Sequence, residues 1–92
     1  MTDTEQRVGT MAVLAEVGAE RRRQIKLGYD AAHDDQHTRG EILTAPWGAI
    51  ARARVALDGT LRAGIRRQAL IEAAALCIAE AERMDRSGGR DG

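Results

Sequence analysis

Residues 69–79 read ALIEAAALCIA, and Glu72 is the one charged residue in this run. An α-helix with 3.6 residues per turn would carry apolar side chains on nearly every side here, and a helix without a polar face is buried between other elements. We therefore expect this segment to be the central helix of a three-helix bundle or the seam of a dimer.

The pattern along the chain predicts an all-α protein with helices over residues 4–27, 38–57 and 61–86. Gly28 is expected to end the first helix in a left-handed conformation, and residues 58–60 (Asp-Gly-Thr) form a turn before the third. We expect one helical domain over residues 1–86 and a glycine-rich, disordered tail over residues 87–92.

Two signals compete at the start of the second helix. Thr38 and Glu41 have the spacing of a capping box, in which each side chain bonds an unpaired backbone N–H group. Pro46 lies inside the predicted span, so it either kinks the helix or splits it, with Thr44 as the alternative cap.

Helical periodicity also predicts which side of each helix is buried. The expected buried positions are Met11, Leu14, Val17, Gly18 and Ile25 in the first helix, and Ile42, Ala45, Ala49, Ile50, Ala53 and Leu57 in the second. Arg52 and Arg54 are expected to point outward, and Cys77 to be an inert thiol in the core.

Composition limits the class of protein. The chain has 92 residues, no Phe, and much of its apolar content is Ala, so its core is thin and self-association is as reasonable as a monomer. Lys plus Arg and Asp plus Glu both number 14, which argues against nonspecific binding to nucleic acid or to an anionic membrane. One cysteine, a polar N-terminus without a signal-peptide pattern and the lack of a long apolar run predict a cytoplasmic protein.

The densest group of polar side chains is the segment 33–41, HDDQHTRGE, which holds both histidines of the chain. The candidate metal ligands are His33, Asp35, His37 and Glu41, because imidazole with carboxylate suits Zn, Mn, Fe or Ni and carboxylates alone suit Mg. The spacing matches no established metal motif. The alternative is structural, with an aspartate capping the second helix and His37 bonded to Glu41.

Other candidates lie on the three helices. Glu16 and Glu20 with Arg23 are either a solvated ion-pair face or two carboxylates directed at a metal or cationic ligand. Glu72 needs a partner if it is buried, and we expect Arg21 to be that partner; a catalytic Glu72 is the alternative. Trp47 is expected at the rim of the core, or else as a platform on which a base stacks.

The blocks ERRRQ (20–24) with Gly28, HDDQHTRGE (33–41) and LIEAAALCIAEAERMDR (70–86) resemble a group of small phage and prophage proteins. The resemblance covers about residues 13–86 and implies a mobile-element protein in a bacterial cytoplasm.

A looser resemblance is to the MazG-type all-α nucleoside triphosphate pyrophosphohydrolases, which hold Mg²⁺ with E-x-x-E on one helix and E-x-x-D on another. Glu82 and Asp85 fit the second motif at the end of the chain, whereas Glu16 and Glu20 are four residues apart instead of three.

Two functions follow as hypotheses. The first is an interaction protein without enzymatic activity, which binds and modulates a host protein or defence complex. The second is a metal-dependent protein that binds a nucleotide-like ligand or hydrolyses a phosphoanhydride. In the second, the metal ligands are carboxylates aided by the two histidines, and Arg21 and Arg23 offset phosphate charge. The acidic residues in that set are Glu16, Glu20, Asp35, Glu41 and Glu72.

Overall fold

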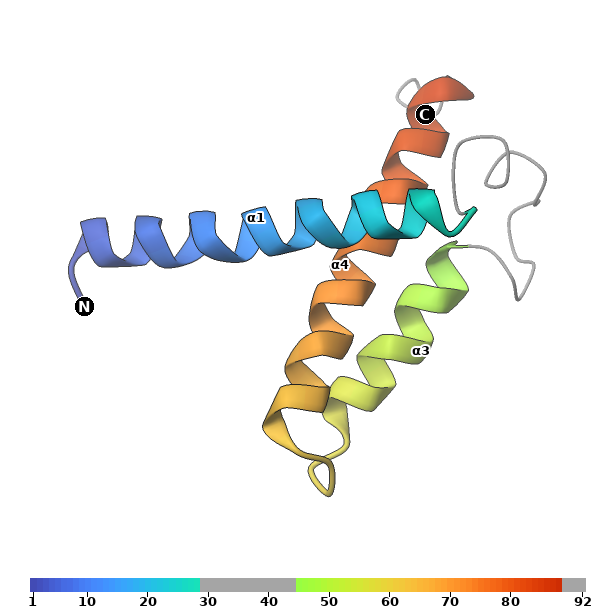
Figure 1. Ribbon diagram of the computed structural model, residues 1–92. Coiled ribbons are helices and arrows are strands. Elements are labelled where there is room, and N and C mark those ends of the chain that lie inside the picture. The colour runs from blue at the N-terminus through green and yellow to red at the C-terminus, as the bar shows by residue number, and fades with distance from the viewer. Residues whose placement is uncertain (29–44, 89–92) are drawn as a thin grey trace.

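The computed structural model describes residues 1–28 and 45–88, and within them the chain is helical. The helices are α1 (Asp3–Lys26), α3 (Ala45–Leu57) and α4 (Ala63–Arg86). α3 and α4 run side by side as an antiparallel hairpin, and α1 crosses α4 with only its C-terminal half (Figure 1). The predicted all-α class is confirmed. The predicted residues 38–44 of the second helix, with Thr38, Glu41, Ile42 and Thr44, lie outside the described residues.

Both ends of α1 have recognisable signals. The Thr2 hydroxyl accepts a hydrogen bond from the backbone N–H of Glu5, and the Glu5 carboxylate accepts one from the backbone N–H of Thr2. This capping box satisfies two N–H groups that a helix leaves unpaired. At the other end Leu27 is the C-cap and Gly28 has φ +103°, which confirms the predicted termination.

The hairpin connection is also as predicted. Both the backbone N–H and the hydroxyl of Thr60 donate to Oδ1 of Asp58, at 3.0 and 2.6 Å. α3 begins at Ala45, so Pro46 lies in its first turn, where its missing N–H removes no helical hydrogen bond. The predicted kink at Pro46 is not confirmed.

The core consists of two small clusters on different sides of α4. Val17 of α1 packs against Ile71 and Ala75, and Ala49 of α3 packs against Ala73 and Leu76. A Cβ added at Gly48 would lie 3.0 Å from a methyl group of Leu76, so the missing side chain lets α3 approach α4 closely. α4 is thus the central helix, as one of the two alternatives for residues 69–79 predicted.

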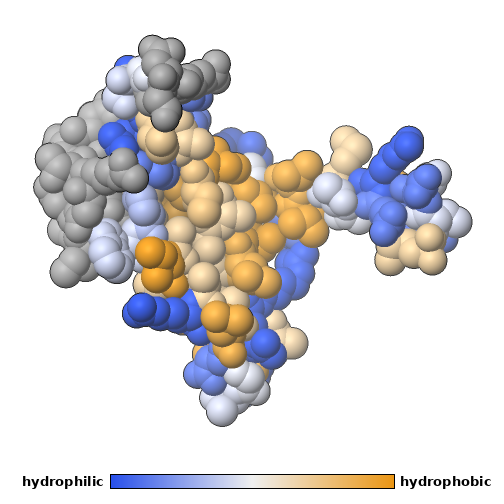
Figure 2. Space-filling model, turned by 180° about the vertical axis from the view of Figure 1, so that it is seen from behind, coloured by the Kyte–Doolittle hydropathy of each residue, from blue (hydrophilic) through white to orange (hydrophobic). Residues whose placement is uncertain are grey.

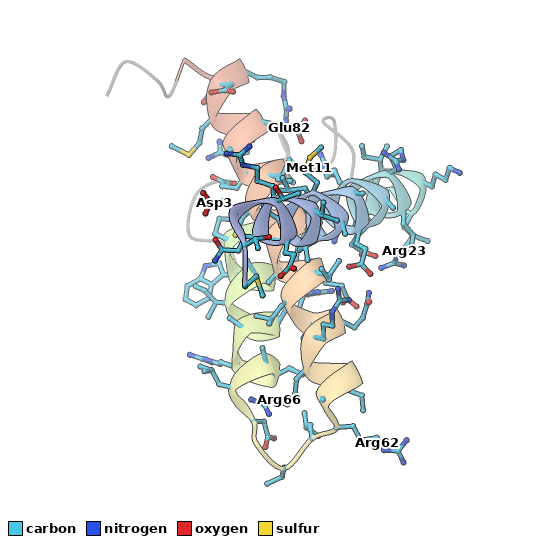
Figure 3. The ribbon with its side chains drawn as sticks, turned by 90° about the vertical axis from the view of Figure 1, so that its left-hand side faces the viewer. Asp3, Met11, Arg23, Arg62, Arg66 and Glu82 are labelled. Atoms are coloured by element: carbon cyan, nitrogen blue, oxygen red, sulfur yellow. The ribbon has the colours of Figure 1, made fainter. Side chains whose placement is uncertain are left out.

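The N-terminal half of α1 departs from the expected burial. Met11 is 69% exposed and Leu14 60% exposed, although both were predicted to face the core. In Figure 1 this half of α1 projects beyond the hairpin, and in Figure 3 Asp3 and Met11 lie toward the viewer, in front of α4. The periodicity identified the apolar side of the helix, but of Met11, Leu14 and Val17 only Val17 joins the core cluster on α4. We call residues 3–15 the arm.

Other predicted core positions are exposed as well. They are Ile25, Ile50, Leu57 and Cys77. Within the described residues, α1 and α3 each pack mainly on α4. Side chains on the other sides of α1 and α3, and on the sides of α4 that neither helix covers, therefore remain exposed. None of the helices in the described ranges has both the length and the apolar character that a membrane-spanning segment needs.

Candidate functional site

Six polar side chains meet where the C-terminal half of α1 passes the hairpin, and we call this group the polar junction. It comprises Glu20, Arg23 and Gln24 of α1, Arg52 of α3, and Gln68 and Glu72 of α4. α1 turns Glu20 and Gln24 toward α4 because they are four residues apart and therefore share a face with Val17.

Glu20 is a buried carboxylate held by two neighbours on its own helix. Arg23 donates to both of its oxygens, from Nε at 2.8 Å and from Nη2 at 2.7 Å, and Gln24 Nε2 donates to Oε2 at 3.1 Å. The hydrogen bond from Arg23 lowers the pKa of Glu20 below its ordinary value of 4.5, against the opposing effect of burial. Glu20 is therefore an anion at neutral pH.

Gln24 links α1 to α4. Its Nε2 also lies 3.4 Å from the backbone carbonyl oxygen of Glu72, so one amide bridges a side chain and a neighbouring helix. Gln24 is only 4% exposed, and its Oε1 accepts no hydrogen bond within the described part of the chain. A buried acceptor without a donor costs about 1–3 kcal/mol.

Glu72 is half-buried and accepts from α3 and from its own helix. Arg52 Nε donates to Oε1 at 3.1 Å and Gln68 Nε2 donates to Oε2 at 3.1 Å. The predicted Arg21–Glu72 pair is wrong, and so is the outward orientation of Arg52, which also donates to the backbone oxygen of Gly48. Glu72 lies on the side of α4 that faces α3, where Arg52 reaches it first.

Arg21 is buried, but its partner is Glu82, with Nε 3.0 Å from Oε1. Glu82 follows Ala75 by seven residues and so returns to the same face of α4, which is the face that meets α1. Figure 3 shows Glu82 and Arg23 on opposite sides of α1. Arg21, which binds Glu82, and Arg23, which binds Glu20, therefore stabilise different parts of the interface.

Glu16 lies apart from Glu20, although both are acidic and four residues apart. It is exposed and accepts from Arg67 of α4, with Nη1 3.2 Å from Oε1. This hydrogen bond lowers the pKa of Glu16. The two carboxylates do not form a shared site, and the described Glu16 fits the interpretation of a solvated ion pair.

A groove of about 380 Å³ lies beside the polar junction, between α3 and α4. It is lined by Arg52, Val55, Gly64, Ile65, Gln68, Ala69 and Glu72. The groove is mainly apolar with one charged pair at its edge, which suits a small amphipathic group better than a triphosphate.

The remaining predicted site residues are placed as follows. Trp47 lies in the first turn of α3 and is 41% exposed, at the rim and not in the core. The metal-ligand candidates of the segment 33–41 lie outside the described residues, namely His33, Asp35, His37 and Glu41. Among residues 1–28 and 45–88, no group of three or more His, Cys, Asp or Glu side chains is arranged to hold a metal ion.

Both carboxylates of the polar junction are already paired. Both of its carboxylates accept from an arginine and from a glutamine amide, so their charge is already compensated. Sequence patterns did not indicate Arg52, Arg67 or Glu82 as partners, because each pairs with a residue more than 15 positions away.

No protein-family model, curated protein or solved structure matches this chain.

Proposed function

We propose that this chain is an interaction protein without enzymatic activity, and that the arm of α1 is the segment its partner binds. Residues 8–15 read VGTMAVLA, without a single charge, and all eight are exposed. Exposed apolar side chains on a helical segment that belongs to neither core cluster of the described residues are typical of a protein-binding segment.

The arm is ready for such binding because it is already helical. The capping box of Thr2 and Glu5 and the acidic side chains in the first turn stabilise its N-terminal end. At the other end, Val17 and Arg21 hold the helix against α4. A partner that binds the arm in an apolar groove therefore has little conformational entropy to remove.

The partner class comes from the resemblance to small phage and prophage proteins. We propose a host protein in the bacterial cytoplasm, for example an enzyme or a defence complex, whose activity the bound arm modulates. The surface of the arm supports a partner groove lined by apolar side chains, and does not support nucleic acid, which needs clustered positive charge.

The decisive comparison uses two variants with one introduced charge each. Met11→Glu places a carboxylate on the arm, and Ala51→Glu places one on the exposed outer side of α3. A host protein that is captured from lysate should be tested again as a purified component, by titration with the wild-type chain and both variants. We expect Met11→Glu to weaken binding at least about tenfold, and Ala51→Glu to bind as the wild type does. Equal binding by Met11→Glu would contradict the proposal.

A second candidate is binding of a nucleotide-like ligand with a divalent metal, and its one support among the described residues is the guanidinium of Arg52 at the edge of the groove. Arg52 could contact a phosphate there, and the segment 33–41 would have to supply metal ligands. Mixed nucleoside triphosphates with Mg²⁺ or Mn²⁺ test this candidate. Release of pyrophosphate, lost in Glu72→Gln, would establish it and refute a purely non-enzymatic role.

A further inference from the structure

The contact between α1 and α4 is short and mainly polar. Four side chains of α1 are buried, and three of them are polar, namely Glu20, Arg21 and Gln24. The fourth is Val17, which packs against Ile71 and Ala75 of α4. One apolar side chain therefore provides the hydrophobic part of the contact from α1, and charged and amide groups provide the rest.

The buried amide of Gln24 lowers the stability of this contact. Its Oε1 is shielded from water and accepts no hydrogen bond within residues 1–28 and 45–88. When α1 leaves α4, water can donate to this oxygen, so the cost of the unpaired acceptor disappears. That cost is of the same order as the gain from burying one valine side chain. The hydrophobic part of the contact is therefore nearly offset.

Two ion pairs join α1 to α4, and we call them the clasp. In the first, Arg67 Nη1 lies 3.2 Å from Glu16 Oε1. In the second, Arg21 Nε lies 3.0 Å from Glu82 Oε1. Arg67 comes before, and Glu82 after, the α4 residues that Val17 contacts, so the clasp holds α1 on both sides of the crossing. Three of its four side chains are about half exposed, so dissolved salt can screen both pairs.

The α3–α4 hairpin is held by contacts of another kind. α3 packs on α4 through Ala49, Ala73 and Leu76. Hydrogen bonds from Thr60 to Asp58 close the turn between the two helices. Figure 2 shows apolar residues gathered over α3 and α4 on the face seen from behind. The hairpin therefore depends mainly on apolar and short-range contacts, which salt does not screen.

We propose that α1 is a releasable helix, which leaves α4 as a unit when the clasp is screened or broken while the α3–α4 hairpin stays paired. Release adds Val17 to the exposed apolar side chains of Met11 and Leu14, which share one side of α1 with it. It also uncovers Ile71 and Ala75. α4 thus covers one end of an apolar stripe, and the clasp sets how much of α1 a partner can bind. Release itself does not rest on the proposed function, since it can be measured on the chain alone.

Thiols introduced at two buried alanines of α4 distinguish release of α1 from general loosening. In a Cys77→Ser background, Ala75→Cys reports the face that α1 covers and Ala73→Cys the face that α3 covers. Each rate with an uncharged thiol reagent is divided by the rate of the exposed thiol in Ala51→Cys. Between about 0.02 and 1 M NaCl, we expect the thiol at position 75 to react at least about fivefold faster, and the thiol at position 73 to change less than about twofold. Equal changes at the two positions, or no change at position 75, would overturn the proposal.

Charge reversal tests the clasp without altering its apolar neighbours. Arg67→Glu places two carboxylates opposite each other and should raise the thiol rate at position 75 at least about fivefold at low salt. Adding Glu16→Arg restores an attractive pair in the opposite order and should return the rate to within about twofold of the starting value. The control Arg54→Glu makes the same charge change on an exposed position of α3 and should have no effect. A rate insensitive to Arg67→Glu, or not restored in the double variant, would contradict the proposal.

Amide hydrogen exchange provides a measurement on the unsubstituted chain. We expect residues 17–24 of α1 to exchange at least about fivefold faster in 1 M NaCl than at low salt, and residues 49–56 of α3 to change less than about twofold. A parallel rise in both helices would mean that the fold opens as a whole. That result, or exchange in α1 that does not depend on salt, would refute release of α1 as a unit.

Discussion

Arg52 of α3 donates from Nε to Oε1 of Glu72 on α4 across 3.1 Å, and this pair joins the two helices of the hairpin beside the place where α1 crosses. Glu72 is the one charged residue in the long apolar run of α4. Glu72 thus has a structural role, because its carboxylate binds α3 to α4.

A double-mutant cycle measures what this pair contributes. Because both side chains are partly exposed, we expect Arg52→Ala and Glu72→Gln to show a coupling free energy of about 0.5–1 kcal/mol in urea unfolding. Arg54→Ala, on an exposed position of the same helix, should change the free energy of unfolding by less than about 0.5 kcal/mol. Additive single-mutant effects would show that Arg52 and Glu72 act independently.

Acid should weaken the fold through Glu20. Its pKa is lowered in the folded state, mainly by Arg23, so its stabilising contribution is complete above the ordinary value of 4.5 and is lost as the pH falls through the folded-state pKa. We expect the free energy of unfolding to decrease across that window.

Glu20→Gln provides the check on this assignment. The variant should be less stable than the wild type at neutral pH, and its stability should depend less steeply on pH below 4.5. Glu16→Gln should alter the acid response less, because the Glu16–Arg67 pair is exposed to solvent. An unchanged acid slope in Glu20→Gln would remove Glu20 as the source.

Substitutions at two valines of α1 test whether the helix is packed only in its C-terminal half. Val17→Ala truncates the apolar side chain with which α1 joins the core cluster, and we expect a loss of about 1–2 kcal/mol in the free energy of unfolding. Val8→Ala should be neutral or slightly stabilising, because Val8 is exposed and alanine favours a helix. A similar loss at both positions would mean that the arm is packed in solution.

Local signals in the sequence predicted the local structure well. Gly28 ends α1 and the Asp58–Thr60 contact closes the hairpin turn, because each depends on neighbouring residues alone. The apolar run of residues 69–79 likewise predicted that α4 is the central helix, with α1 and α3 packed on it. These features can be predicted without knowing which residues of other helices they contact.

The contacts between helices could not be predicted in the same way. Periodicity places Met11, Leu14 and Val17 on one side of α1, but only Val17 is buried, since burial depends on where α4 crosses. The partner of Arg21 depends on the same crossing, which brings Glu82 within reach and leaves Glu72 to Arg52. The residues 33, 35, 37 and 41, on which a metal site depended, lie outside the described residues.

The central claim is that the arm extends from the fold and belongs to neither core cluster of residues 1–28 and 45–88. Amide hydrogen exchange of the purified protein, read residue by residue along α1, tests this claim most directly. We expect the amides of residues 8–15 to exchange at least about tenfold faster, relative to their intrinsic rates, than those of residues 17–24, which pack on α4. Equal protection along the whole of α1 would contradict the claim, because it would mean that the arm is packed as firmly as the half of the helix that lies on α4.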